Sequence, residues 1–251
     1  MINIIRKIYF FNISEYYFRN NLPDVLQLKK NKIDFINLIQ ANFQFNRSRP
    51  FHTFNINLKE DIEIIWKKIN KDFRYQIKRA ENKDKISETI IDNPSMRDID
   101  MFIEFFNKFA EVRSLRKANK NKLSIFLKQK KLKIAYAHTL DDKFNILSGH
   151  CYIHDEKRIR LYHSASNVNV KIINKNLVGR SNKLLHWKVI TKFKKSDFHI
   201  YDFGGVSHTK HFNGIDKFKS HFHGEMVTEF SGLIPLSNKA KFVFFILKFL
   251  N

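Results

Sequence analysis

The chain has 251 residues, of which 43% are hydrophobic and 26 are phenylalanine, so it can bury a core in one large domain or two small ones. Its 46 Lys and Arg against 24 Asp and Glu give a net charge of +22, which favours a phosphate-bearing partner, although the joint overuse of Lys, Asn, Ile and Phe points to AT-rich coding as a duller cause. The single cysteine, Cys151, excludes a disulfide framework and a cysteine-based metal site.

Residues 1–50 are expected to form a small strand and helix extension, which we interpret as a candidate remnant of a second domain half. The N-terminus lacks the continuous apolar run and the cleavage site of a signal peptide. No segment of the chain approaches the roughly 20 apolar residues that a bilayer span requires. These features predict a cytoplasmic protein.

The region from residue 51 to 166 predicts a strand, two helices and a meander. Residues 51–58 alternate as in a strand, and residues 61–82 and 98–115 carry apolar side chains at helical spacing. Three further strand-like runs follow, separated by the short polar connections "DDKF" and "DEKR", which predict antiparallel hairpins over residues 132–140, 145–154 and 159–166.

The rest of the chain predicts a helix that begins at Gly179, a short strand over residues 198–205 and a final strand region over residues 218–236. The element order therefore predicts a mixed α/β fold with a largely antiparallel central sheet flanked by helices. Residues 236–251 form an apolar and basic segment. It is expected either to dock in the core as a last helix or strand, or to contact a membrane surface from the cytoplasmic side.

Residues 200–225, "IYDFGGVSHTKHFNGIDKFKSHFHGE", hold four of the chain's seven glycines, together with Asp202 and several lysines and histidines. Glycine permits positive φ and close backbone approach, so such a cluster indicates a site with tight geometry. The histidines of this stretch, His208, His211, His221 and His223, do not reproduce a compact metal-binding motif. We therefore expect no metal.

Several segments resemble the Fem-like branch of the GNAT acyltransferase superfamily, over residues 51–235. They are "HTFNINLKEDIEIIWKKINKDFRYQIKRAEN", "LYHSASN", "VGRSNKLLHWKVI", and "YDFGG" followed by "GIDKFKSHFHGE". The last pair is the most specific, although His223 stands where the family usually has a glycine. The resemblance implies a GNAT-like fold with a splayed sheet that grips the acyl donor.

The resemblance also implies a function. It predicts an N-acyltransferase that uses acetyl-CoA or another acyl-CoA to acylate the amine of a nucleotide- or lipid-linked amino sugar in surface-polysaccharide biosynthesis. The alternative is a Fem-type transfer from aminoacyl-tRNA to a peptidoglycan precursor. Typical Fem enzymes carry two complete GNAT-like domains, and the chain is short for both.

The expected donor site lies at Gly179, Arg180, Ser181 and Asn182. The free N–H groups and the positive dipole end of a helix N-terminus suit the pyrophosphate of CoA, and an arginine adds charge-assisted hydrogen bonds. An ordinary capped helix is the alternative interpretation of the same residues.

The expected catalytic residues are His163 and Asp202, each at the end of a predicted strand. Histidine titrates near neutrality and suits proton removal from an amine, and a carboxylate can orient the amine; Asp202 can equally cap the turn that follows it. The glycine turn and its flanking charges would line the acceptor site, through Gly204, Gly205, Lys217, Lys219 and Glu225. The lysines would suit a phosphate-bearing acceptor, or else form a solvated face.

Overall fold

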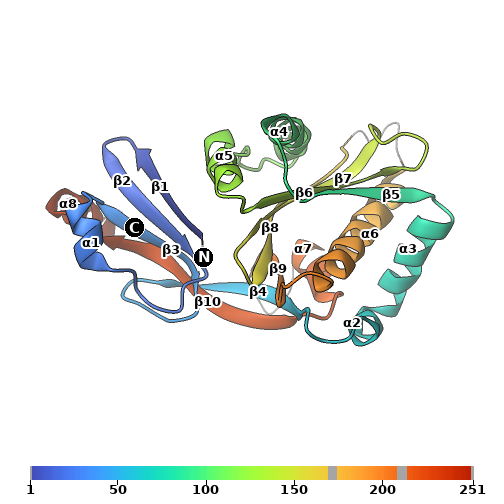
Figure 1. Cartoon of the computed structure of the whole chain (residues 1–251), viewed down its shortest axis with the longest axis horizontal. Coiled ribbons are helices and arrows are strands. Elements are labelled where there is room, and N and C mark those ends of the chain that lie inside the picture. Colours follow the sequence, from blue (N-terminus) through green and yellow to red (C-terminus); the bar gives the residue numbers. More distant parts are fainter. Residues whose placement is uncertain (1, 169–173, 208–213, 250–251) are drawn as a thin grey trace. The chain divides into compact units, whose positions relative to one another are not determined.

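A computed structural model describes residues 2–168, 174–207 and 214–249, and for residues 247–249 it describes the backbone only. The chain divides into two compact units (Figure 1). One comprises Met1–Thr53 with Met226–Asn251, and the other comprises Phe54–Glu225. Residues 226–235, which we expected in the acyltransferase domain, thus belong with the N-terminal extension, because they pair with one of its strands.

The first unit contains the strands β1 (Ile2–Ile8), β2 (Phe11–Tyr17), β3 (Phe35–Ala41) and β10 (Glu225–Pro235), in that spatial order. The pairing of β2 with β3 is parallel, and the other two pairings are antiparallel. Helix α1 (Val25–Lys30) begins at Asp24, whose carboxylate accepts a hydrogen bond from the N–H of Gln27. The strand and helix content expected for residues 1–50 is therefore present.

The C-terminal segment forms helix α8 (Asn238–Phe249) in the same unit. Ala240 is buried in a cluster with Ile13 and Phe35, whereas Phe242 remains 66% exposed. The segment is thus docked on one side as a last helix. No helix in the described parts of the chain is long and apolar enough to cross a bilayer.

The second unit contains the part of β4 from Phe54 onward and five further strands, in the order β4-β9-β8-β7-β6-β5. Their bounds are β4 (Arg49–Asn57), β5 (Ile86–Ile91), β6 (Leu132–Thr139), β7 (Ile146–His154), β8 (Arg158–Ser166) and β9 (Ile200–Val206). The pairings β5–β6, β6–β7 and β7–β8 are antiparallel, which confirms the predicted meander. The mixed α/β class and the largely antiparallel sheet are confirmed as well.

Helices cover both faces of this sheet. In Figure 1, α4 (Met96–Val112) and α5 (Lys120–Lys128) lie over one face of β6 and β7, while α3 (Lys71–Asn82) and α6 (Lys175–Lys194) lie over the other. The main core lies between the sheet and the second helix pair. It includes residues such as Leu161, Leu184 and Tyr201, which are almost fully buried.

The helix expected over residues 61–82 is two helices, α2 (Ile62–Lys68) and α3. Asn70 separates the two helices, because its side chain accepts hydrogen bonds from the N–H groups of Asp72 and Phe73 and so caps the start of α3. The predicted helix at residues 98–115 is confirmed as α4, which begins with a capping box between Ser95 and Asp98.

Three elements were missed from the sequence: β5, α5 and the short helix α7 (Gly214–Ser220). Helix α7 is anchored to the end of β9, since the buried carboxylate of Asp216 accepts hydrogen bonds from the backbone N–H and the hydroxyl of Ser207. This anchor places α7 beside the sheet.

Candidate active site

The parallel pairing of β8 with β9 is short. The ladder runs from Arg158 opposite Ile200 to Arg160 opposite Asp202. Beyond it, β8 continues to Ser166 and β9 to Val206 without a further pair between them. Two parallel strands that stop pairing part-way leave backbone groups available to a ligand, which is the opening that the GNAT resemblance implied.

A cavity of about 600 Å³ lies along the unpaired part of β8. Its walls come from β8, α6, α7 and the end of α4, through Phe109, Arg113, Leu115, Leu161, Ser164, Ala165, Ser166, Asn182, His186, Gly214, Ile215, Phe218 and Lys219. The charged residues among these described lining residues, Arg113 and Lys219, are both cations. We call this cavity the cleft; its charge suits an anionic ligand.

Gly204 lies where β9 passes close to Leu161 of β8. It has a φ of +71°, and a Cβ atom there would lie 2.8 Å from the carbonyl oxygen of Leu161. Both the backbone conformation and the space therefore require glycine. The sequence expectation of tight geometry at this turn is confirmed.

Lys219 is the predicted substrate residue that reaches the cleft. Its ammonium group donates a hydrogen bond to the carbonyl oxygen of Gly205 at 2.6 Å. Burial lowers the pKa of Lys219 to about 8, and the carboxylates of Asp216 and Asp202 oppose that shift. The cleft therefore contains a partly desolvated cation that titrates near neutral pH.

Asp202 is fully buried and its side chain serves the turn. Its carboxylate accepts a hydrogen bond from the N–H of Gly204 at 2.7 Å and lies 3.7 Å from the guanidinium of Arg158. It does not belong to the residues that line the cleft. The capping interpretation of Asp202 thus has direct geometric support, and its catalytic role stays a prediction.

His163 lies on the other side of the sheet from α6. Its ring contacts those of Phe106 and Tyr162, with centroids 4.5 and 4.6 Å away, and it is not among the residues that line the cleft. Burial, and then the charges of Arg160 and Lys122, lower the pKa of His163 to about 4. The structure therefore does not bring together the two predicted catalytic side chains at the cleft.

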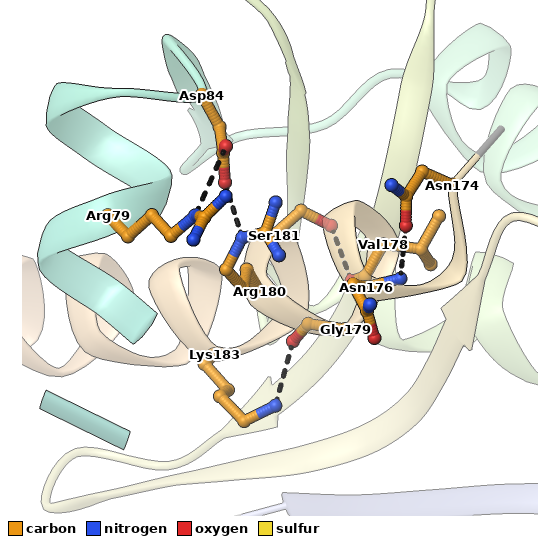
Figure 2. Close-up of polar contacts among 9 residues, drawn as sticks. All are labelled: Arg79, Asp84, Asn174, Asn176, Val178, Gly179, Arg180, Ser181 and Lys183. Atoms are coloured by element: carbon orange, nitrogen blue, oxygen red, sulfur yellow. Dashed lines mark hydrogen bonds and ion pairs between the residues drawn. The ribbon is translucent and has the colours of Figure 1, made fainter. Parts of the chain in front are cut away.

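The predicted donor segment lies inside a helix rather than at its start. Helix α6 begins at Lys175 after the cap Asn174, so Gly179 falls in the second turn and the argument from free N–H groups no longer applies. Figure 2 shows the side chains that follow. Arg180 pairs with Asp84 at 2.5 Å, and the hydroxyl of Ser181 donates to the carbonyl oxygen of Val178 at 2.8 Å.

The remaining predicted residues are distributed around the site. Gly205, Lys217 and Glu225 are exposed and do not line the cleft. His223 has a φ of +53°, the left-handed conformation that glycine favours, which accounts for the glycine usual at this place in the resemblance. His208 and His211 lie outside the described residues. Within the described residues, no three potential metal-ligating side chains gather into one site.

A chain of buried polar side chains, which we call the buried chain, runs from the cleft into the core. His186 Nδ1 lies 2.6 Å from the hydroxyl of Tyr201, which lies 3.2 Å from the hydroxyl of Tyr152. That hydroxyl lies 2.7 Å from His150 Nδ1, and His150 Nε2 lies 2.7 Å from Asn182 Oδ1. Asn182 and His186 both line the cleft, so the buried chain begins and ends at its wall.

Burial holds the members of the buried chain in their uncharged forms. It lowers the pKa of His150 to about 4, against the effect of the hydrogen bond to Asn182, and lowers the pKa of His186 well below its ordinary value. It likewise raises the pKa of both Tyr152 and Tyr201. At neutral pH the contacts are therefore hydrogen bonds between neutral groups.

Sequence analysis missed the buried chain, although some of its spacing was visible. His150 and Tyr152 alternate along one strand, so their side chains share a face, and Asn182 and His186 are four residues apart on one helix. The sequence did not show that α6 packs on the face of β7 that carries His150 and Tyr152. This packing depends on the order of the strands in the sheet.

No protein-family model matches the chain, and no curated protein sequence matches it. Solved structures show the likeness of its fold. A structure described as FemX shares 10% of the sequence, covers 92% of this chain and 84% of its own, and gives a TM-score of 0.64. The C-terminal domain of a putative lysylphosphatidylglycerol synthetase from Agrobacterium fabrum shares 10% of the sequence, covers 97% of this chain and 83% of its own, and gives a TM-score of 0.60. L-PGS from Bacillus licheniformis shares 11%, covers 96% of this chain and 83% of its own, and gives a TM-score of 0.58.

These identities show likeness of fold alone. The Fem-like fold that the sequence predicted is thereby supported over most of the chain, in a mixed α/β structure. The likeness includes the N-terminal region, because each match covers at least 92% of the chain.

Proposed function

We propose that the protein is a transferase that moves an activated acyl group to an amine in the cleft. The observation that carries this proposal is the end of the β8–β9 ladder at Arg160 and Asp202, with the cleft beside the unpaired part of β8. Unpaired strand N–H groups suit the carbonyl oxygen of an acyl donor, which becomes negatively charged as the amine attacks.

Lys219 supports the same chemistry. A cation in a partly dry cleft stabilises the negative charge that develops on the carbonyl oxygen, or binds a phosphate of the acceptor. Gly204 and Asp202 would shape the floor of the site without direct contact with the reacting atoms. In this proposal, proton removal does not require His163.

Two donors remain candidates. Acyl-CoA, the donor expected from the sequence, would be used to acylate the amine of a nucleotide- or lipid-linked amino sugar. Aminoacyl-tRNA is favoured by the fold likeness to FemX and to proteins named for the synthesis of lysylphosphatidylglycerol. The net charge of +22 suits the phosphate groups of either donor.

The test is a donor screen with mass detection of the product. One arm combines acyl-CoA thioesters with nucleotide-linked amino sugars, and the other combines aminoacyl-tRNAs with lipid-linked peptidoglycan precursors. We expect transfer in one arm, a large loss in Lys219→Met, and little change in Lys217→Met, which alters an exposed lysine of the same helix. Absence of transfer in both arms would contradict the proposal.

A further inference from the structure

Two side chains of α6 in the wall of the cleft, Asn182 and His186, each have one polar atom that no hydrogen bond uses among the described residues. They lie four residues apart, hence on one face of the helix, and both line the cleft. Asn182 Oδ1 and His186 Nδ1 are taken up by the buried chain. Among the described residues, Asn182 Nδ2 and His186 Nε2 have no hydrogen-bond partner, although His186 is only 1% exposed.

The direction of the hydrogen bonds follows from the Asn182 end. An amide oxygen only accepts, so His150 Nε2 must carry its proton and donate to Asn182 Oδ1. His150 is neutral and therefore has a lone pair at Nδ1. That lone pair accepts a hydrogen bond from the hydroxyl of Tyr152.

The same reasoning continues to the other end. Because the proton of Tyr152 points to His150, the oxygen of Tyr152 accepts from the hydroxyl of Tyr201. The oxygen of Tyr201 then accepts from Nδ1–H of His186. A neutral imidazole has one N–H, so His186 Nε2 carries a lone pair and no proton.

We propose that Asn182 and His186 bind the acyl acceptor as a pair. His186 Nε2 accepts a hydrogen bond from the acceptor's N–H or O–H, and the amide N–H of Asn182 donates to an oxygen on the adjacent carbon of the same molecule. The buried chain holds both groups in the required orientation. This inference deepens the proposed function. It rests on that function only where it identifies the bound molecule as the acyl acceptor.

The surroundings define the class of ligand. Lys219 and Lys183 are the cations that act on His186. Its ring contacts that of His150, with centroids 4.2 Å apart, and the phenyl rings of Phe203, Phe218 and Phe222. This environment disfavours an ammonium group and accepts a neutral amine. An amine flanked by a hydroxyl, as in an amino sugar, supplies the donor and the acceptor that the pair requires.

The first test is ¹⁵N NMR of the histidine-labelled protein, without any substrate. We expect His186 to be protonated at Nδ1 and bare at Nε2. Tyr201→Phe removes the acceptor of Nδ1–H and should increase the Nε2–H tautomer. Tyr136→Phe is the matched control, since its buried hydroxyl has no partner in the described structure, and it should leave the His186 signals unchanged. A proton at Nε2 in the wild-type protein would overturn the inference.

The second test is a titration with glucosamine at pH 8, where its amine is largely uncharged. The control is 2,2,2-trifluoroethylamine, which is also uncharged at this pH and lacks the neighbouring oxygen. We expect glucosamine to shift the His186 Nε2 resonance saturably and trifluoroethylamine to shift it much less. Equal shifts, or no shift with glucosamine, would overturn the binding role. Both tests are independent of turnover, so failure of the proposed function and failure of this inference give different results.

Discussion

Arg160 and Asp202 form the last residue pair of the parallel ladder between β8 and β9. Past this pair, the backbone of Gly204 still approaches the carbonyl oxygen of Leu161 so closely that a Cβ atom at residue 204 would lie 2.8 Å from it. The cleft begins on the same stretch of β8, with Leu161 in its wall. The end of strand pairing and the start of the candidate site therefore coincide.

Lys219 should set the alkaline limit of activity. Its pKa of about 8 means that the cation is fully present below that pH and is lost as the pH rises through it. If the charge stabilises the reacting carbonyl oxygen, turnover should fall above about pH 8. Lys219→Arg should move this fall to higher pH, because arginine stays protonated. The measurement is turnover as a function of pH for both proteins. If turnover of Lys219→Arg falls at the same pH as that of the wild type, Lys219 does not stabilise the reacting oxygen.

Arg180 should matter for stability rather than for donor binding. Its side chain and that of Asp84 are each 12% exposed, so Arg180→Ala leaves a largely buried carboxylate whose remaining ion-pair partner, Arg79, lies 3.8 Å away. We expect Arg180→Ala to lower the free energy of unfolding by about 1–3 kcal/mol. Denaturant unfolding of Arg180→Ala, of Asp84→Ala and of the double variant should show that the two side chains are energetically coupled.

Lys108→Ala is the control for this cycle, since its partner Glu104 lies on an exposed helix surface and little change is expected. If Arg180→Ala instead loses affinity for the donor and keeps its stability, the predicted role of Arg180 in donor binding is supported.

His163 should make stability depend on pH without affecting turnover. In the folded protein its pKa is about 4, against about 6.5 in the unfolded chain, so the unfolded state binds more protons between these values. Stability should therefore fall as the pH decreases through this window. His163→Phe should reduce the loss between pH 7 and pH 5 by about 1–2 kcal/mol, measured by urea unfolding. Loss of turnover at pH 7 in a folded variant would instead support the predicted catalytic role.

His223→Gly should stabilise the protein. The exposed His223 has a φ of +53°, where a side chain costs about 1 kcal/mol relative to glycine. Lys67→Gly, in an exposed position of α2, should have the opposite effect because its backbone is helical. Midpoints of thermal unfolding compare the two, and a lower midpoint for His223→Gly would contradict the prediction.

The elements predicted correctly are those whose local patterns match their structure. The strands β6, β7 and β8 are strand-like runs separated by short polar turns, and α4 has a regular apolar face. The break at Asn70 was missed because apolar residues continue at helical spacing across it. The start of α6 was misplaced because Gly179 was taken as the start, whereas Asn174 carries the cap.

The candidate site was predicted only in part for a related reason. Gly204 and Lys219 belong to a local cluster of unusual composition, which a sequence displays directly. The contacts of His150 with Asn182, and of His186 with Tyr201, join elements far apart in the chain. Their residue types are visible in the sequence, but their meeting depends on the order of strands in the sheet.

The most direct test of the central claim is protection of the cleft by the acyl donor. Ser164→Cys places a thiol in the wall of the cleft, and the native Cys151 is fully buried. A donor that supports turnover should slow maleimide labelling of this thiol and should not slow labelling of Ser196→Cys, an exposed position after α6. Equal labelling of Ser164→Cys with and without such a donor would contradict the claim that the donor's acyl group enters between β8 and β9.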